Sequence, residues 1–216
     1  MIDYDVIKTG SSGNCTVIDR RIAIDAGVPY KALRQYAPVL KLVLVTHLHQ
    51  DHFIPSTIRK LAEERPTLRF GTPPWMVNHL VFNGVCKRNI DVYAMGMMNR
   101  YGDDLSVVAL ELSHDKQNCG YKLNVRGHRV LYATDTRTMA GIKAKNYDLY
   151  LLEANYNEDE IRERIRQKEE SGEYVYEWRV LRNHLSERNA LDWLYANMTQ
   201  KSRYVLLHGH NQDFVS

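Results

Sequence analysis

The sequence predicts an α/β fold, because strand-like and helix-like segments alternate along its 216 residues. Apolar, β-branched runs such as residues 41–45 and 105–112 are typical of buried strands, and the amphipathic run that begins at Pro55 is typical of a surface helix. The chain contains no internal repeat, no low-complexity tract and no convincing linker. A chain of this length can bury a sizeable core, so we predict one α/β domain over residues 1–216.

The first half of the chain reads as strands separated by turns and two helical segments. Proline is favoured in the first turn of a helix, so a helix is expected from Pro55 until just before Pro66, and an amphipathic segment follows from Trp75. Residues 95–102 have the composition of a loop. Strand character is found at residues 4–8, 15–18, 21–24, 41–45, 68–70 and 91–93.

The second half of the chain predicts further strands at residues 105–112, 119–125, 129–133, 147–153 and 204–207. Ser186 has the features of an N-cap for a final helix. Residues 157–168 form a charged helix in which Arg and Glu alternate, which usually marks a solvated face. A basic surface for a phosphate backbone is the alternative, and the arginines around His184 (Arg179, Arg182 and Arg188) favour it somewhat.

Residues 46–52 hold the densest group of ionisable side chains in the chain. They follow the apolar strand at 41–45 and place His47, His49, Asp51 and His52 within six positions. Imidazole nitrogen and carboxylate oxygen both suit divalent zinc. His47 and His49 alternate along an extended chain, so both can point to one side. A metal-binding loop is therefore predicted, and a solvated histidine-rich turn is the alternative.

Three other strands end in residues that can bind a metal. These residues are His114, Asp135 and His208. One histidine at a strand end would mean little, but four strand ends of this kind indicate a shared site. His79 and His128 are interpreted as an ordinary helix residue and an exposed turn residue, and His210 as a neighbour of His208.

Composition and short motifs indicate a globular cytoplasmic protein without a P-loop. The net charge of +3, with 44% hydrophobic and 25% charged residues, is ordinary for a globular protein. The acidic start of the chain lacks an apolar signal core, and no apolar run approaches membrane-spanning length. Cys15, Cys86 and Cys119 have no C-x-x-C spacing, so reduced thiols in a cytoplasmic protein are expected. The small-residue loop at 9–14 lacks the Lys-Ser/Thr ending of a P-loop and is expected to pack beside the metal loop.

The sequence His47-Leu48-His49-Gln50-Asp51-His52, with Asp25 before it and His114, Asp135 and His208 after it, resembles the metallo-β-lactamase superfamily over nearly the whole chain. A closer similarity is to its small YycJ/WalJ-type, exonuclease-like branch. That similarity depends on short motifs in a shared order, at residues 11–15, 24–27, 153–155 and 184–186.

The resemblance implies a four-layer αββα sandwich with two divalent ions at one edge, of which zinc fits best and manganese or iron are possible. It assigns His47, His49 and His114 to the first ion and Asp51, His52 and His208 to the second, with Asp135 bridging them. It also implies that Asp25 orients the loop, and that a bridging hydroxide attacks the substrate. His184 resembles the histidine that related nucleases place against the scissile phosphate, and a surface histidine before a helix cap is the alternative. Asp51, Asp135 and His184 are thus the predicted catalytic residues.

The function expected from these residues is metal-dependent hydrolysis of a phosphodiester bond in a nucleic acid or nucleotide. Only 73 positions separate Asp135 from His208, too few for the long β-CASP-type insertion with which ribonuclease relatives hold RNA. A thioester or lactone hydrolase on the same metal core is one alternative. A catalytically silent nucleic-acid-binding protein is another, and an exported β-lactamase is not expected.

Overall fold

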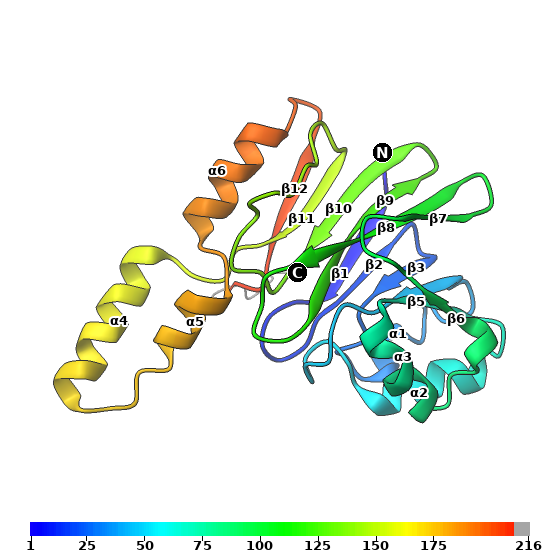
Figure 1. The fold of residues 1–216 in the computed structure, drawn as a ribbon, viewed down its shortest axis with the longest axis horizontal. Coiled ribbons are helices and arrows are strands. Elements are labelled where there is room, and N and C mark those ends of the chain that lie inside the picture. The colour runs from blue at the N-terminus through cyan, green and yellow to red at the C-terminus, as the bar shows by residue number, and fades with distance from the viewer. Residues whose placement is uncertain (210–216) are drawn as a thin grey trace.

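The computed structural model describes residues 1–209, so His210 lies outside the described part of the chain. Two six-stranded sheets pack face to face, and helices lie on their outer faces (Figure 1). Each sheet contains both parallel and antiparallel pairs. This arrangement confirms the predicted α/β sandwich.

The first sheet comes from the N-terminal part of the chain. Its strands, in their spatial order, are β1 (Tyr4–Lys8), β2 (Cys15–Ile18), β3 (Ile22–Ile24), β4 (Leu42–Leu44), β5 (Arg69–Thr72) and β6 (Ile90–Val92). The outer helices of this half are α1 (Tyr30–Leu33), α2 (Pro55–Glu64) and α3 (Val77–Phe82), with short 3₁₀ turns at Pro74–Met76 and Lys87–Asn89. In β4, Leu42 and Leu44 face the second sheet whereas Val43 faces the helices, as the two-residue period of a strand requires.

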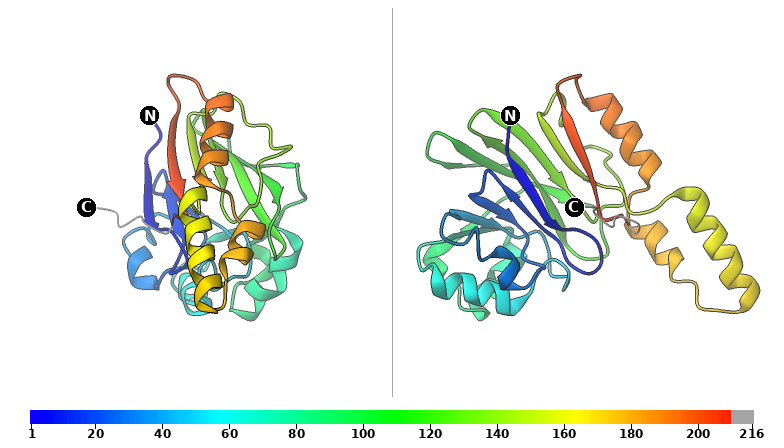
Figure 2. Two further views of the ribbon diagram at one scale, coloured as in Figure 1. Left: turned by 90° about the vertical axis from the view of Figure 1, so that its left-hand side faces the viewer. Right: turned by 180° about the vertical axis from the view of Figure 1, so that it is seen from behind.

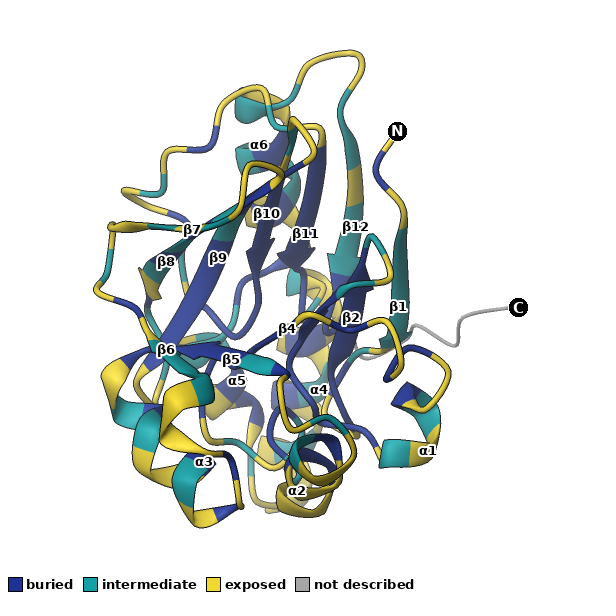
Figure 3. Cartoon of the chain, turned by 90° about the vertical axis from the view of Figure 1, so that its right-hand side faces the viewer, coloured by how far each residue is buried: buried dark blue, intermediate teal, exposed yellow. Residues whose placement is uncertain are grey.

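The second sheet is formed by the rest of the chain. In spatial order its strands are β12 (Arg203–Leu207), β11 (Leu149–Glu153), β10 (His128–Ala133), β9 (Asn118–Val125), β8 (Leu105–Leu112) and β7 (Met98–Tyr101). Helix α6 (Glu187–Asn197) packs Ala190 and Leu194 against Leu131 and Leu152 on the outer face of this sheet. Figure 3 shows β9, β10 and β11 buried along most of their lengths.

Two further helices extend away from the sandwich. Helix α4 (Glu158–Ser171) begins at the N-cap Asn157, whose side chain accepts hydrogen bonds from the amides of Asp159 and Glu160, and it ends at Gly172 in a left-handed conformation. Helix α5 (Glu177–Asn183) runs back beside it, and together they project from the sheets (Figure 2). Among residues 1–209, no helix combines the length and the apolar character needed to cross a membrane.

The sequence-based assignment of residues 95–102 to a loop is wrong. Residues Met98–Tyr101 form β7, the edge strand that pairs antiparallel with β8. Its side chains alternate between exposed and half-buried, so it lacks the apolar pattern of an inner strand. Its backbone pairing with a long neighbouring strand makes it a strand in spite of its polar composition. Helices α1 and α5, four and seven residues long, were also not expected from the sequence.

Candidate metal centre

The topology brings the histidine- and aspartate-bearing strand ends to one place. β3 and β4 are parallel, and so are β10, β11 and β12. β8 points the same way as β10, because both are antiparallel to β9. The residues that follow the carboxyl ends of these strands therefore meet at one edge of the sandwich. Asp25, residues 46–52, His114, Asp135 and His208 are all in such positions.

Three imidazoles form the first cluster. The distance from His47 Nε2 to His49 Nδ1 is 3.0 Å, and from His49 Nδ1 to His114 Nε2 it is 3.3 Å. Two nitrogens bound tetrahedrally to zinc at about 2.0–2.1 Å would be about 3.3 Å apart. Burial is the main cause that lowers the pKa of each of the three imidazoles, so the neutral form with a free lone pair is favoured.

The second cluster is built around two carboxylates. Asp51, His52, Asp135 and His208 offer ligand atoms that all lie within 4.8 Å of one another. Asp135 Oδ2 lies 2.6 Å from His52 Nε2 and 3.4 Å from His47 Nε2, and its Oδ1 lies 3.3 Å from His208 Nε2. Asp135 therefore lies between the two clusters, in the position expected of a bridging carboxylate.

Asp25 supports the second cluster from behind. Its Oδ2 lies 2.6 Å from His52 Nδ1, and its Oδ1 accepts a hydrogen bond from the Thr46 amide at 2.9 Å. The contact with Asp25 keeps the proton on Nδ1 and turns Nε2 of His52 toward Asp135. Burial disfavours the imidazolium, but the carboxylates of Asp135 and Asp25 raise the pKa of His52 well above its usual range. A divalent ion at His52 Nε2 would compete with a proton for this nitrogen.

The donor set fits divalent transition metal ions. Neither carboxylate oxygen of the buried Asp135 makes a hydrogen bond of regular geometry within residues 1–209, although imidazole nitrogens surround them. Asp25, Asp135 and His208 all have positive φ angles, of 62°, 53° and 63°, which non-glycine residues adopt rarely and which cluster at functional sites. The structure thus brings together the seven residues proposed as ligands, and their role in metal binding stays a prediction.

Glu153 is a site residue that the sequence reasoning gave no role. It is the last residue of β11, and the proposed His and Asp ligands likewise follow the ends of strands. This position at a strand end is the signal that could have identified Glu153. The buried carboxylate lies with Oε1 2.5 Å from His184 Nδ1, and its Oε2 accepts from the Thr136 amide at 2.6 Å. Burial and then the charge of Asp135 raise the pKa of Glu153 well above its usual range.

His184 lies at the centre and not at a remote part of the surface. Its Nδ1 is 3.5 Å from Asp135 Oδ1, and its ring stacks on that of His208 with centroids 5.2 Å apart. The alternative in which His184 is merely a surface histidine before a helix cap therefore does not fit its position. Burial lowers the pKa of His184, as expected for an imidazole at the inner wall of a site.

A cavity of about 390 Å³ opens beside the two clusters. Its lining joins the metal-binding residues to helix α5, since Tyr176, Arg179 and Asn183 contribute to the wall. Arg179 also forms an ion pair with Asp115 at 2.5 Å, next to His114. Asp115 in turn lies 3.2 Å from His114 Nε2. Arg179 is the one arginine among the described residues that line this cavity, and the aspartates Asp51, Asp115 and Asp135 line it as well.

Comparisons with known proteins bear on the family and the fold of the chain. The sequence model of a family described as "Beta-lactamase superfamily domain" matches residues 17–208. No curated protein matches the sequence.

Three solved structures share the fold at low sequence identity. The metallo-beta-lactamase fold protein YhfI from Bacillus subtilis has a TM-score of 0.72 at 15% identity, covering 98% of this chain and 88% of that one. The short form of human tRNase Z has a TM-score of 0.66 at 14% identity, covering 97% and 92%. A diphosphatase from the PhnP family has a TM-score of 0.65 at 13% identity, covering 97% and 87%.

Proposed function

The chain belongs to the beta-lactamase superfamily domain family, and from that premise we propose that it is a metal-dependent hydrolase that cleaves phosphodiester bonds in a nucleic acid or nucleotide. The observation that carries the proposal is the position of His184. It is held by Glu153 and faces Asp135 in a cavity lined by residues of both histidine and carboxylate clusters. The names of two structural neighbours, a tRNase and a diphosphatase, support phosphate chemistry on this fold.

The proposed centre holds two divalent ions, with His47, His49 and His114 at the first, Asp51, His52 and His208 at the second, and Asp135 between them. When bound, such ions stabilise the charge on the phosphoryl oxygens and supply a water nucleophile at neutral pH. Zinc is favoured because imidazole nitrogen and carboxylate oxygen suit it, and manganese or iron remain alternatives for the same set.

The protein's own residues supply the proton transfer and the orientation. Burial favours the protonated carboxyl of Glu153, which in this proposal donates to Nδ1 of His184, so the neutral ring carries its proton on Nε2, the nitrogen left to meet a substrate. In this proposal the bond between phosphorus and the leaving oxygen breaks as water attacks, and His184 donates a proton to the leaving oxygen. The proton released by the attacking water restores His184. Arg179, on the same wall, is placed to attract the phosphate.

A hydrolysis assay tests this proposal. Protein loaded with zinc or manganese is given labelled DNA, labelled RNA, a chromogenic phosphodiester, a thioester and a lactone. We expect turnover of phosphodiesters, and we expect His184→Ala to lower kcat by about 10²–10⁴-fold, the usual contribution of a general acid, while the metal content stays unchanged. His79→Ala, an exposed histidine on α3, is the matched control and should keep full activity.

Other outcomes would redirect the assignment. Hydrolysis of the thioester or lactone without any phosphodiester turnover would support the other hydrolase class. Binding of nucleic acid by metal-loaded protein with no turnover of any substrate would support a catalytically silent binding protein.

A further inference from the structure

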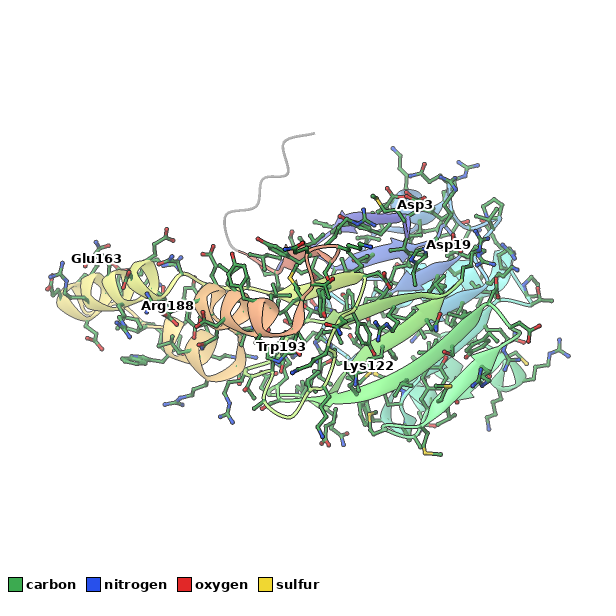
Figure 4. All side chains as sticks on the ribbon, turned by 90° about the horizontal axis from the view of Figure 1, so that it is seen from above. Asp3, Asp19, Lys122, Glu163, Arg188 and Trp193 are labelled. Atoms are coloured by element: carbon green, nitrogen blue, oxygen red, sulfur yellow. The ribbon has the colours of Figure 1, made fainter. Side chains whose placement is uncertain are left out.

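Helices α4 and α5 and the turn between them form an arm, residues 158–183, that extends from the sandwich (Figure 2). Residues of α5 line the cavity described above. Figure 4 shows Glu163 of α4 well away from the sheets. The arm has a small core of its own, in which Ile161 and Ile165 of α4 pack against Val180 of α5. Its aromatic side chains are therefore not needed to close the main core.

Residues 174–182 of the arm combine exposed aromatic rings with arginines. Within residues 174–182, Tyr174 is 85% exposed, Tyr176 is 43% exposed and Trp178 is 46% exposed. Arg179 and Arg182 are also exposed. The only carboxylate of this segment, Glu177, is buried and pairs with Lys168 at 2.7 Å. The segment thus presents aromatic rings and the positive charge of Arg182 to solvent, while Arg179 is paired with Asp115 outside the segment.

This aromatic–arginine segment is continuous with the candidate metal centre. Tyr176 and Arg179 line the same cavity as His184. At the end of α5, the carbonyl of Asn183 lies 3.2 Å from His114 Nδ1, and His184 is the next residue. A helix rises by about 1.5 Å per residue, so Trp178 is roughly 9 Å from His184 along the axis of α5. A strand of about three stacked nucleotides, at about 3.4 Å each, would span this distance.

We propose that residues 174–182 bind single-stranded nucleic acid and guide its end into the cavity; this inference rests on the proposed function. Aromatic rings stack on unpaired bases of any sequence, and arginines contact the phosphates between them. A duplex keeps the faces of its bases covered, so the exposed rings favour a single strand. The strand is expected to follow α5, because α4 carries six carboxylates against four basic residues.

The test is fluorescence anisotropy with full-length protein, measured once zinc-loaded and once in EDTA. The probe is a labelled single-stranded oligothymidylate of about twelve nucleotides, within the usual site sizes of single-strand-binding surfaces. We expect Trp178→Ala to weaken binding by about fivefold or more. Arg182→Ala should reduce the slope of log K against log salt by about 0.7, the value for one phosphate contact on a single strand.

A matched control shows whether the loss of binding is specific to aromatic rings of the arm. Tyr195→Ala removes an exposed ring on α6, outside the arm, and should leave binding unchanged. The thermal midpoint of each variant shows whether it is folded, and Tyr174→Ala, in the turn before α5, provides a second variant if Trp178→Ala fails to fold.

The inference is overturned if folded Trp178→Ala and Tyr174→Ala bind the oligonucleotide as tightly as the wild type, or if a duplex of equal length binds as tightly as the single strand. Hydrolysis of a chromogenic diester by the wild type tests the proposed function separately. Diester turnover with unchanged binding by the arm variants removes only the inference about the arm. Arm-dependent strand binding in a protein that hydrolyses no phosphodiester removes only the proposed function.

Discussion

Asp25 shows how one buried residue can fix the orientation of a whole loop. It directly follows β3 in a left-handed conformation, and its carboxylate contacts His52 and both the amide and the hydroxyl of Thr46. Aspartate and asparagine both tolerate this backbone conformation, since their short polar side chains can hydrogen-bond locally. The position can therefore be tested without disturbing the backbone.

Asp25→Asn replaces one accepting oxygen with an amide that donates, so a contact to Thr46 or to His52 is lost. We expect the affinity for zinc to fall by about 10–100-fold, the usual effect of removing a residue that orients a metal-binding histidine. Competition with a fluorescent chelator measures the affinity. Asp104→Asn, at an exposed carboxylate paired with Arg21, serves as the control. Equal zinc affinity in Asp25→Asn and the wild type would contradict the role assigned to Asp25.

Tyr36 predicts how stability depends on alkaline pH. Its hydroxyl donates to Asp5 Oδ2 at 2.9 Å, and burial, then this hydrogen bond, raise the pKa of Tyr36 from its usual value near 10 to about 12. The unfolded chain loses this proton at a lower pH than the folded chain, so the stabilisation present below about pH 10 is lost as the pH rises toward 12. Urea unfolding at about pH 9 and pH 11 should show a shallower decline for Tyr36→Phe than for the wild type. Parallel declines would contradict the assignment.

At the scale of elements, three loops pack together to hold the metal loop. The Asn14 amide donates to the carbonyl of Asp51 at 2.6 Å, and its side-chain Nδ2 donates to Asp51 Oδ2 at 3.0 Å. Residues 9–14 therefore pack beside the metal loop, as the sequence led us to expect. Gly27, after β3, approaches the same loop so closely that a Cβ atom there would lie 1.7 Å from the carbonyl oxygen of Asp51.

Gly27→Ala should displace the metal loop, because the nearest atoms are backbone and cannot rotate away. We expect a loss of about 1–3 kcal/mol in the free energy of unfolding, as for an overpacked core, together with weaker zinc binding. Urea unfolding and metal analysis measure the two effects. Ser12→Ala, at an exposed position in the neighbouring loop, should change neither. A fully stable, zinc-binding Gly27→Ala protein would show that this close approach does not hold the loop in place.

At the scale of the molecule, the candidate centre connects the two sheets. His47, His49, Asp51 and His52 follow β4 of the first sheet, whereas His114, Asp135 and His208 follow strands of the second. A bound ion would therefore hold both sheets together at this edge. Unfolding separates the ligands, so binding should stabilise the whole fold.

Zinc at about 100 times its dissociation constant should add about 2.7 kcal/mol to the free energy of unfolding. For a protein of this size, that corresponds to a rise in Tm of roughly 5–10 °C. Scanning calorimetry with zinc and then with EDTA measures the shift. Asp135→Asn replaces the carboxylate between the two clusters with an uncharged amide, so zinc should raise the Tm of this variant much less. The absence of any shift in the wild type, together with no bound metal by elemental analysis, would contradict the predicted centre.

The sequence by itself determined the α/β class, the superfamily resemblance and the set of residues that meet at the candidate centre. It could do so because His47, His114, Asp135 and His208 follow apolar strands, and strands that run the same way deliver their ends to one edge of a sheet. The membership of the superfamily is confirmed, whereas the YycJ/WalJ-type branch and the ligand roles stay predictions. A single domain over residues 1–216 without a β-CASP-type insertion also stays a proposal.

Only the tertiary structure decided which distant side chains become partners. Glu153 and His184 are 31 positions apart, and their contact depends on how α5 returns to the end of β11. The pair of Asp115 and Arg179 likewise spans 64 positions. Strand β7 and helix α5 lack a long periodic pattern, so the sequence did not predict them. An edge strand and a two-turn helix are stabilised mainly by the elements they pack against. Helix α4 of the arm was expected from the sequence, whereas its pairing with α5 beside the cavity follows from that packing.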